Sequence, residues 1–176
     1  IYNFVWHTYC DWYIEFTKPI FASNNKSAIS ETRNFASYTL SNILKLLHPF
    51  IPFFTEHTWK KNDFNKVFNS DLITSDWPTP KKISSFSKSS SEIEALIQII
   101  SSIRSTKVQL NIPPKEFCEI TLSNENKNTK KSIVDNDEVI KQVGRVSKIN
   151  INQTNSKNDI QIIVLNEKIG LKFETN

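Results

Sequence analysis

The chain has 176 residues, 38% of them hydrophobic, enough for one ordinary domain or for one domain with a small appendage. Its 2 glycines exclude a glycine-rich phosphate loop, and its 2 cysteines lie too far apart for a zinc ribbon or a disulfide framework. The 22 Lys and Arg against 18 Asp and Glu permit a polyanionic partner without requiring one. No apolar run is long enough to cross a bilayer, so we expect no membrane partner and a cytoplasmic location.

The first predicted helix runs from Ile1 to about Ala22. Because no capping residue precedes its helical pattern, we expect the chain to be a piece of a longer polypeptide. The aromatic residues of this helix form two rows at helical spacing and cannot all face one core, so at least one exposed aromatic face is predicted. Pro19 should end or kink the helix near Lys18.

Two further helices are predicted in the first half of the chain. The second follows a polar loop, has Ser27 or Ser30 as its expected cap, and ends at His48. The third is short: it starts near Pro52, whose missing N–H costs nothing in a first turn, and continues to about Lys60.

Residues 61–91 are predicted to form a long, weakly patterned connection. A fourth helix should then begin at a capping box formed by Ser91 and Glu94, and its apolar stripe continues to Val108. Pro113 prevents the helix from continuing further.

After Pro114 the pattern changes from helical spacing to alternation. The predicted strands are 117–122, 146–151, 160–165 and 168–173. A helix over 130–143, with Gly144 as its C-cap, separates the first two strands. The expected fold class is therefore mainly α: a helical bundle over residues 1–112, followed by a small α+β appendage over residues 113–176.

No catalytic arrangement is visible in the sequence. His7, His48 and His57 lack the spacing of metal ligands or of triad partners, which favours structural roles. Asp11 and Glu15 lie one helical turn apart, a spacing that suits an acid/base pair but is more typical of a solvated edge or a cation contact. We therefore expect no catalytic residue, no metal and no cofactor within this chain.

The aromatic residues of the first helix leave two interpretations open. Most of the rings are expected to pack in a core. Rings that face outward can stack on unpaired bases, each stack contributing on the order of 1–3 kcal/mol, while neighbouring lysines bind phosphate. The alternative is a helical protein-interaction domain that uses its exposed aromatic face to bind a partner chain.

A series of motifs runs through the chain in a defined order. They are Phe4-Val5-Trp6, Cys10-Asp11-Trp12-Tyr13-Ile14-Glu15, Lys18-Pro19, Leu44-Lys45-Leu46-Leu47-His48-Pro49-Phe50-Ile51-Pro52-Phe53, Thr55-Glu56, Trp59, Trp77-Pro78, Ile103-Arg104 and Ile112-Pro113-Pro114. The series resembles the anticodon-binding domain of the valyl-tRNA synthetases, strongly over residues 1–122 and weakly beyond. The run at residues 10–15 is more typical of the valine enzymes than of the related isoleucine and leucine enzymes.

This resemblance implies a helical bundle that grips the anticodon stem-loop of valine tRNA. The implied parent is a class I ligase that attaches valine to its tRNA with ATP and Mg²⁺, and the implied partners are valine tRNA and the rest of the synthetase chain. The residues expected to contact or border the anticodon loop are Trp6, Asp11, Tyr13, Glu15 and Lys18, and those expected to support it through phosphate or helix–helix contacts are Arg33, Lys45 and Arg104. For Arg104, an ion pair between helices is an equal alternative. A purely structural role is favoured for Trp12, Phe16, His48 and Trp59.

Overall fold

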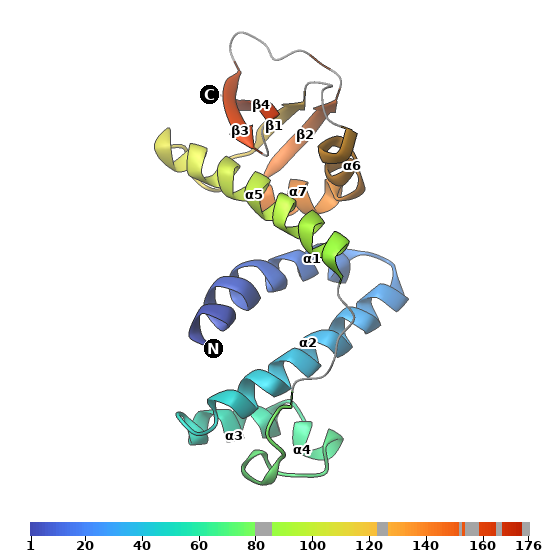
Figure 1. Ribbon diagram of the computed structural model, residues 1–176, viewed down its shortest axis with the longest axis vertical. Helices are drawn as coiled ribbons and strands as arrows, with labels where there is room; N and C mark the ends of the chain where they lie inside the picture. The colour runs from blue at the N-terminus through green and yellow to red at the C-terminus, as the bar shows by residue number, and fades with distance from the viewer. Residues whose placement is uncertain (80–85, 123–126, 152, 154–158, 165–166, 174–176) are drawn as a thin grey trace. The chain divides into compact units, whose positions relative to one another are not determined.

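The computed structural model describes residues 1–79, 86–122, 127–151, 153, 159–164 and 167–173. The chain divides into two compact units, Ile1–Ser84 and Ser85–Asn176 (Figure 1). The boundary between these units, at Ser84, comes before the boundary at residue 112 that the sequence pattern suggests. The reason is that the fourth predicted helix packs against the sheet. Within the described residues, no helix is long and apolar enough to span a membrane.

The described part of the first unit is helical. Its elements are the π-helix η1 (Phe4–Tyr13), α1 (Ile14–Ala22), α2 (Lys26–Leu47), α3 (Pro52–Lys61), α4 (Phe64–Val67) and the 3₁₀-helix η2 (Leu72–Thr74). The first predicted helix is therefore present as η1 continued by α1. The Ile14 N–H donates to the carbonyl of Tyr9, five residues earlier, so a turn of η1 holds about one residue more than an α-helical turn.

Pro19 does not end the first helix, which was one of the two outcomes expected for it. α1 continues through Pro19 to Ala22. Proline has no N–H to donate to the carbonyl of Glu15, so the helix loses one backbone hydrogen bond. The Pro19 ring is buried, as is Thr17, and this packing offsets the lost bond.

The predicted cap of α2 was wrong. The N-cap is Asn25, whose side-chain oxygen accepts a hydrogen bond from the Ala28 N–H at 3.1 Å, rather than Ser27 or Ser30. Asparagine and serine cap helices about equally well, so the sequence offers several starts of similar quality. The other end is as predicted, with His48 as the C-cap.

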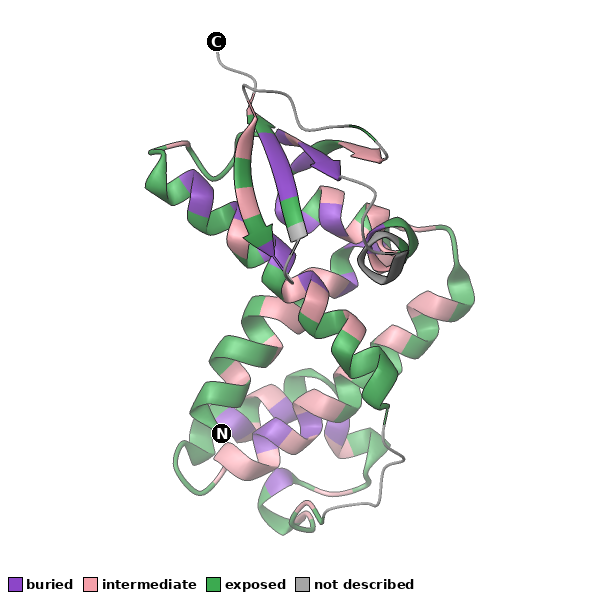
Figure 2. Ribbon diagram, turned by 45° about the horizontal axis from the view of Figure 1, so that its top comes forward, coloured by how far each residue is buried: buried purple, intermediate pink, exposed green. Residues whose placement is uncertain are grey.

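The core of the first unit forms where α2, α3 and the following short helices meet. Its buried residues are Leu44, Trp59, Phe64 and Leu72, with Leu40 packed against them (Figure 2). α3 begins at Pro52 as predicted. The connection predicted for residues 61–91 is partly structured, because α4 supplies Phe64 and η2 supplies Leu72 to this core; residues 80–85 lie outside the described residues.

The described part of the second unit is a four-stranded sheet with three helices. The helices are α5 (Ser87–Gln109), α6 (Lys127–Asp135) and α7 (Asp137–Gly144), and the strands are β1 (Cys118–Leu122), β2 (Val146–Ile151), β3 (Ile160–Val164) and β4 (Glu167–Phe173). The strand order is β2-β1-β4-β3, with β1 parallel to β2 and antiparallel to β4, and β3 antiparallel to β4. The predicted strands are confirmed, except that residue 165 lies outside the described residues.

The predicted capping box of the fourth helix was wrong, because α5 begins a turn earlier, at Ser87. The Ser91 hydroxyl lies within the helix and donates to the carbonyl of Lys88 at 2.8 Å. Glu94 instead accepts a hydrogen bond from the Ser90 hydroxyl at 3.3 Å. Consecutive serines give several possible starts, and the helix uses an early one.

The single helix predicted over 130–143 is broken at Asn136, between α6 and α7. The Asn136 side-chain amide donates to the carbonyl of Ser132 at 2.9 Å, a local bond that competes with helix continuation. Gly144 is the last residue of α7 and not its C-cap. Arg145 is the C-cap and adopts the left-handed conformation, with φ of 55°.

The helices of the second unit cover one face of the sheet. The buried residues of that face are Cys118, Ile120, Leu122, Val146, Val164, Ile169 and Leu171. The helices contribute Leu96, Ile99, Ile100, Ile103, Ile133 and Ile140 to the same core. α6 and α7 provide the crossover that two parallel strands require between β1 and β2.

Candidate nucleic-acid interface

η1 carries an exposed aromatic face, as predicted. No residue of this helix is buried, and Phe4 is exposed along with Tyr2 and Trp6. The Tyr2 and Trp6 side chains are 69% and 56% exposed, and their rings are stacked with centroids 6.5 Å apart and planes 5° apart. We call Tyr2, Phe4 and Trp6 the η1 aromatic face; the helix is coloured mainly exposed in Figure 2. Preformed and accessible rings of this kind are suited to stacking on an unpaired base.

Two other rings of this segment face α2. The Tyr9 and Tyr13 rings are stacked, with centroids 5.4 Å apart, and both are partly buried. Their hydroxyl oxygens lie 3.5 Å from the carbonyls of Ala36 and Thr32, and the Tyr13 ring also packs on Phe35. Burial raises the pKa of both phenols. Tyr13, which was predicted to border the anticodon loop, therefore packs against α2 in this structure.

The predicted structural pair Trp12 and Phe16 lies between these extremes. Both side chains are partly buried, and their ring centroids are 5.8 Å apart. Cys10, in contrast, is exposed. Some rings of this segment are therefore partly buried, whereas other side chains, such as Trp6 and Cys10, are exposed to solvent.

Asp11 and Glu15 do not act as a pair. The Asp11 carboxylate lies 3.5 Å from Nδ1 of His7, and the Glu15 carboxylate lies 2.5 Å from the Lys18 ammonium. Each carboxylate therefore has its own basic neighbour, which does not fit an acid/base couple. Exposed ion pairs contribute only about 0–1 kcal/mol, so a phosphate group can readily compete with Glu15 for Lys18.

The three predicted supporting residues have different surroundings within their own units. Arg33 is exposed on α2. Lys45 lies further along α2, with its ammonium 5.8 Å and 5.2 Å from the ring centroids of Trp59 and Phe68. Arg104 belongs to the second unit and donates a hydrogen bond to the carbonyl of Val143 at 3.1 Å. Lys45 and Arg104 thus make contacts between elements of their own units.

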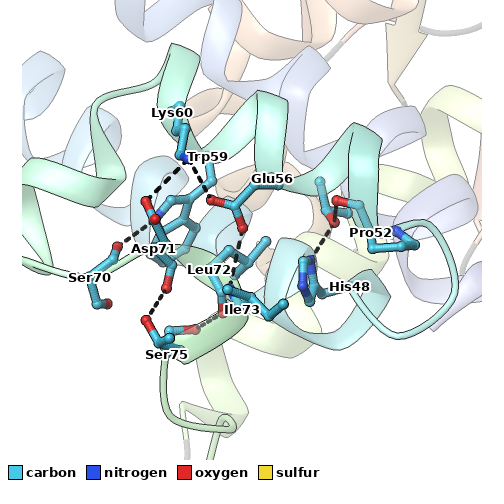
Figure 3. Close-up of polar contacts among 12 residues, drawn as sticks. His48, Pro52, Glu56, Trp59, Lys60, Ser70, Asp71, Leu72, Ile73 and Ser75 are labelled. Atoms are coloured by element: carbon cyan, nitrogen blue, oxygen red, sulfur yellow. Dashed lines mark hydrogen bonds and ion pairs between the residues drawn. The ribbon is translucent and has the colours of Figure 1, made fainter.

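Trp59 and Glu56 hold the segment after α4 against α3 (Figure 3). Trp59 is fully buried, as predicted, and its Nε1–H donates to the carbonyl of Ser70 at 3.0 Å. The Glu56 carboxylate accepts a hydrogen bond from the Ile73 N–H at 3.2 Å. Lys60 lies 3.4 Å from both Glu56 and Asp71, and the hydrogen bond to Asp71 is the main reason that its pKa is raised. The motif residues Glu56 and Trp59 therefore have structural roles.

His48 also has the structural role predicted for it. Its Nδ1 lies 2.9 Å from the Thr55 hydroxyl, which is buried (Figure 3). The same hydroxyl also lies 2.9 Å from the carbonyl oxygen of Ile51 and 3.1 Å from that of Pro52. Which atom donates in the contact with His48 depends on the tautomer of the imidazole ring. The contact fixes the corner between α2 and α3.

The start of α3 presents a second exposed apolar surface, which the sequence did not predict. Its members are Phe50, Ile51, Phe53 and Phe54, and Phe53 is 91% exposed. We call these four residues the α3 apolar face. The signal was present in the sequence: Thr55 and Trp59 lie one turn apart on the buried side of α3, which leaves Phe53 and Phe54 on other sides.

The histidine, cysteine and carboxylate side chains of the described residues are dispersed. Among them, no group of three or more His, Cys, Asp or Glu side chains is arranged to hold a metal ion. The histidine and carboxylate contacts described above are local pairs. The first unit has an accessible aromatic surface and, in the same segment, the ion pair between Lys18 and Glu15, whose lysine could bind another anion instead.

Comparison with known proteins identifies the family. Residues 1–122 match the model of the "Anticodon-binding domain of tRNA ligase" family. The chain is 35% identical to valine–tRNA ligases of Pelagibacter ubique and Mesorhizobium japonicum, over 84% and 94% of its length, and 32% identical to that of Staphylococcus haemolyticus over 80%. These alignments cover 17%, 18% and 16% of the relatives, so the chain spans less than a fifth of their length. The chain belongs to the anticodon-binding domain family of tRNA ligases.

Proposed function

We propose that this chain recognises the anticodon stem-loop of a valine tRNA. The observation that carries the proposal is the stacked and exposed Tyr2–Trp6 pair, which lies inside the region matched by the anticodon-binding family. Anticodon loops present unstacked bases, which proteins bind through aromatic stacking and polar contacts. Trp6, Asp11, Glu15 and Lys18 lie along the same segment and would border the loop.

The remaining predicted residues fit supporting positions. Tyr13 would hold η1 against α2, and Arg33 would contact phosphate. Lys45 and Arg104 would act through the contacts they make within their own units. In the parent enzyme, ATP and Mg²⁺ would serve the attachment of valine in another part of the synthetase chain, and this chain itself would need no cofactor.

The test compares W6A with W77A in the 176-residue chain. Trp77 is a matched control, because it is 57% exposed, lies in the same unit and is not part of η1. Binding is measured by fluorescence anisotropy to two RNA hairpins that differ only in the anticodon. W6A should weaken binding to the valine hairpin by roughly 5- to 150-fold, the equivalent of one lost base stack, and reduce discrimination between hairpins. Equal effects of W6A and W77A would contradict the placement of the site.

The α3 apolar face favours a second contact, with protein. Three exposed phenylalanines close together are unusual on the surface of a free protein and typical of an interface. We propose that the rest of the parent synthetase covers this face. F53S should then weaken association of the separately produced remainder of the enzyme with this chain, and leave hairpin binding unchanged. Loss of hairpin binding with unchanged association would contradict the assignment.

A further inference from the structure

The face of the sheet opposite the helices is polar. In β1, Glu119 and Thr121 alternate with the buried Ile120 and Leu122; Glu119 is partly exposed, whereas Thr121 is itself buried. In β4, Lys168 and Lys172 are exposed, whereas the three residues between them, Ile169, Gly170 and Leu171, are buried. Because successive residues of a strand point to opposite faces, the polar residues of both strands lie on the side away from the helical layer.

The strand register gathers these residues into one surface. Glu119 pairs with Lys148 of β2 on one side and with Lys172 of β4 on the other, and Ile163 of β3 pairs with Lys168. The outer sheet face, as we name it, consists of Glu119, Thr121, Lys148, Asn150, Gln161, Ile163, Lys168, Gly170 and Lys172. These residues come from four strands between positions 119 and 172, so the surface exists only because of the strand order.

This surface carries three ammonium groups and one carboxylate. Glu119 accepts a hydrogen bond from the Asn150 side-chain amide at 3.2 Å. Among the described residues, no carboxylate forms an ion pair within 4.0 Å of Lys148, Lys168 or Lys172. The nine residues of the face therefore carry a formal net charge of +2, from three lysines and one glutamate.

The spacing of the lysines favours an extended anion. Lys148 and Lys172 lie two strands apart, roughly 10 Å between backbones, and Lys168 and Lys172 lie four residues apart, roughly 13 Å. One phosphate ion cannot contact all three at once, whereas a polymer with regularly spaced phosphates can. Among the described residues of this face there is no aromatic side chain to stack on a base, so the face is not suited to recognising a base sequence. Ile163 is the only large apolar side chain among them, so the face is not suited to binding a lipid surface either.

We propose that the outer sheet face binds the sugar–phosphate backbone of RNA, as a second and sequence-independent contact to the tRNA bound by the first unit. The inference rests on the proposed function for its choice of RNA. The lysines would contact phosphates, and the amides of Asn150 and Gln161 would donate to phosphate or accept from ribose 2′-hydroxyl groups. An acidic protein segment is the competing occupant, but it would gain less from these amide groups.

The test is a triple substitution, K148Q/K168Q/K172Q, compared with the control K88Q/K115Q/K131Q. The control lysines are exposed in the same unit but lie outside the sheet, and both triples remove the same charge. Affinity for a full-length valine tRNA transcript is measured from low to moderate salt, with circular dichroism as a check on folding. Each lost phosphate contact should reduce the slope of log K against log salt by about 0.7–0.9, so the sheet triple should lower it by roughly 2–3.

The expected result is a loss of tRNA affinity of tenfold or more for the sheet triple, a smaller effect for the control, and unchanged discrimination between valine and altered anticodons. Equal losses for the two triples would show that only net charge matters, and would overturn the proposal. So would an unchanged salt slope, or a larger effect on binding of poly-glutamate than of tRNA. Failure of the anticodon site is a separate outcome, since it would appear as absent discrimination in the unsubstituted chain.

Discussion

Lys107 of α5 is a buried lysine whose removal tests how the second unit is held together. Its side chain is only 2% exposed. The ammonium donates to the carbonyl of Glu116 at 2.7 Å and lies 3.4 Å from the carbonyls of Gly144 and Arg145. It therefore connects α5, the segment before β1 and the end of α7. Substitution by methionine keeps the aliphatic stem and removes the donor.

The expected cost of K107M is about 2 kcal/mol in the free energy of unfolding of this unit. A hydrogen bond to a charged group contributes roughly 1.5–3 kcal/mol, and the short contact with Glu116 accounts for most of it. The carbonyl of Arg145 stays satisfied, because it also accepts from the Cys118 N–H at 3.1 Å. Removal of a charge from a buried site offsets part of the loss. K115M, at an exposed lysine nearby, should change stability by less than about 0.5 kcal/mol.

The distribution of tryptophan makes the assay selective. All four tryptophans lie in the first unit, so their fluorescence reports that unit, whereas far-ultraviolet circular dichroism reports both. In urea, K107M should move a circular dichroism transition to lower concentration and leave the fluorescence transition in place. A shift of both transitions by the same amount, or of neither, would refute the reasoning.

The pH dependence provides an independent check. Burial lowers the pKa of Lys107 below its ordinary value of about 10.5. As pH rises from the folded-state pKa toward 10.5, the unfolded chain binds more protons than the folded one, so the free energy of unfolding rises. K107M should lack this rise. If the wild type and K107M showed the same alkaline slope, the ammonium would not be the cause.

The remaining predictions concern local structure. T55V should destabilise the first unit by about 1–2 kcal/mol because it removes the hydrogen-bond partner of His48, whereas T58V, on the same helix, should have little effect. Urea titration followed by tryptophan fluorescence separates the two variants, and equal effects would contradict the role of the histidine contact. N25A should cost about 1 kcal/mol through loss of the α2 cap, and N24A should be neutral in the same titration. G144A should be neutral or stabilising by up to about 1 kcal/mol in thermal unfolding, because the glycine is helical and an added Cβ would meet its nearest neighbour at 3.4 Å; a clear loss of stability would show that the site is too tight.

Elements with one strong local signal were predictable from the sequence. The alternation in β1 located that strand, and Pro52 located the start of α3, because each pattern is compatible with few backbone conformations. Boundaries with several equivalent signals were not predictable. The serines before Ser91 allow more than one helix start, and Asn25 caps as well as the neighbouring serines. Gly144 was the predicted C-cap of α7, because glycine adopts the left-handed conformation at no steric cost. The residue that adopts this conformation is Arg145.

The candidate site was predictable only in part, for a different reason. The sequence showed that η1 has more rings than one core can accept, and the exposed face follows from that count. Which rings face solvent depends on α2, since Tyr13 packs against it and Trp6 does not. His48 and Trp59, which contribute much to the family resemblance, are structural. Motif residues therefore identify the family more directly than they identify its binding surface.

The outer sheet face shows why strand order matters more than composition. Each of its lysines is unremarkable in its own strand, and the net charge of the chain is only +4. The η1 segment has carboxylates at Asp11 and Glu15 beside its rings, so its binding energy must come mainly from stacking and shape, which depend little on salt. A basic surface elsewhere in the chain would supply the salt-dependent part of tRNA affinity. On this view affinity and anticodon discrimination respond to salt differently: added salt weakens binding to all tRNAs by a similar factor, while the ratio between valine and other anticodons stays nearly constant.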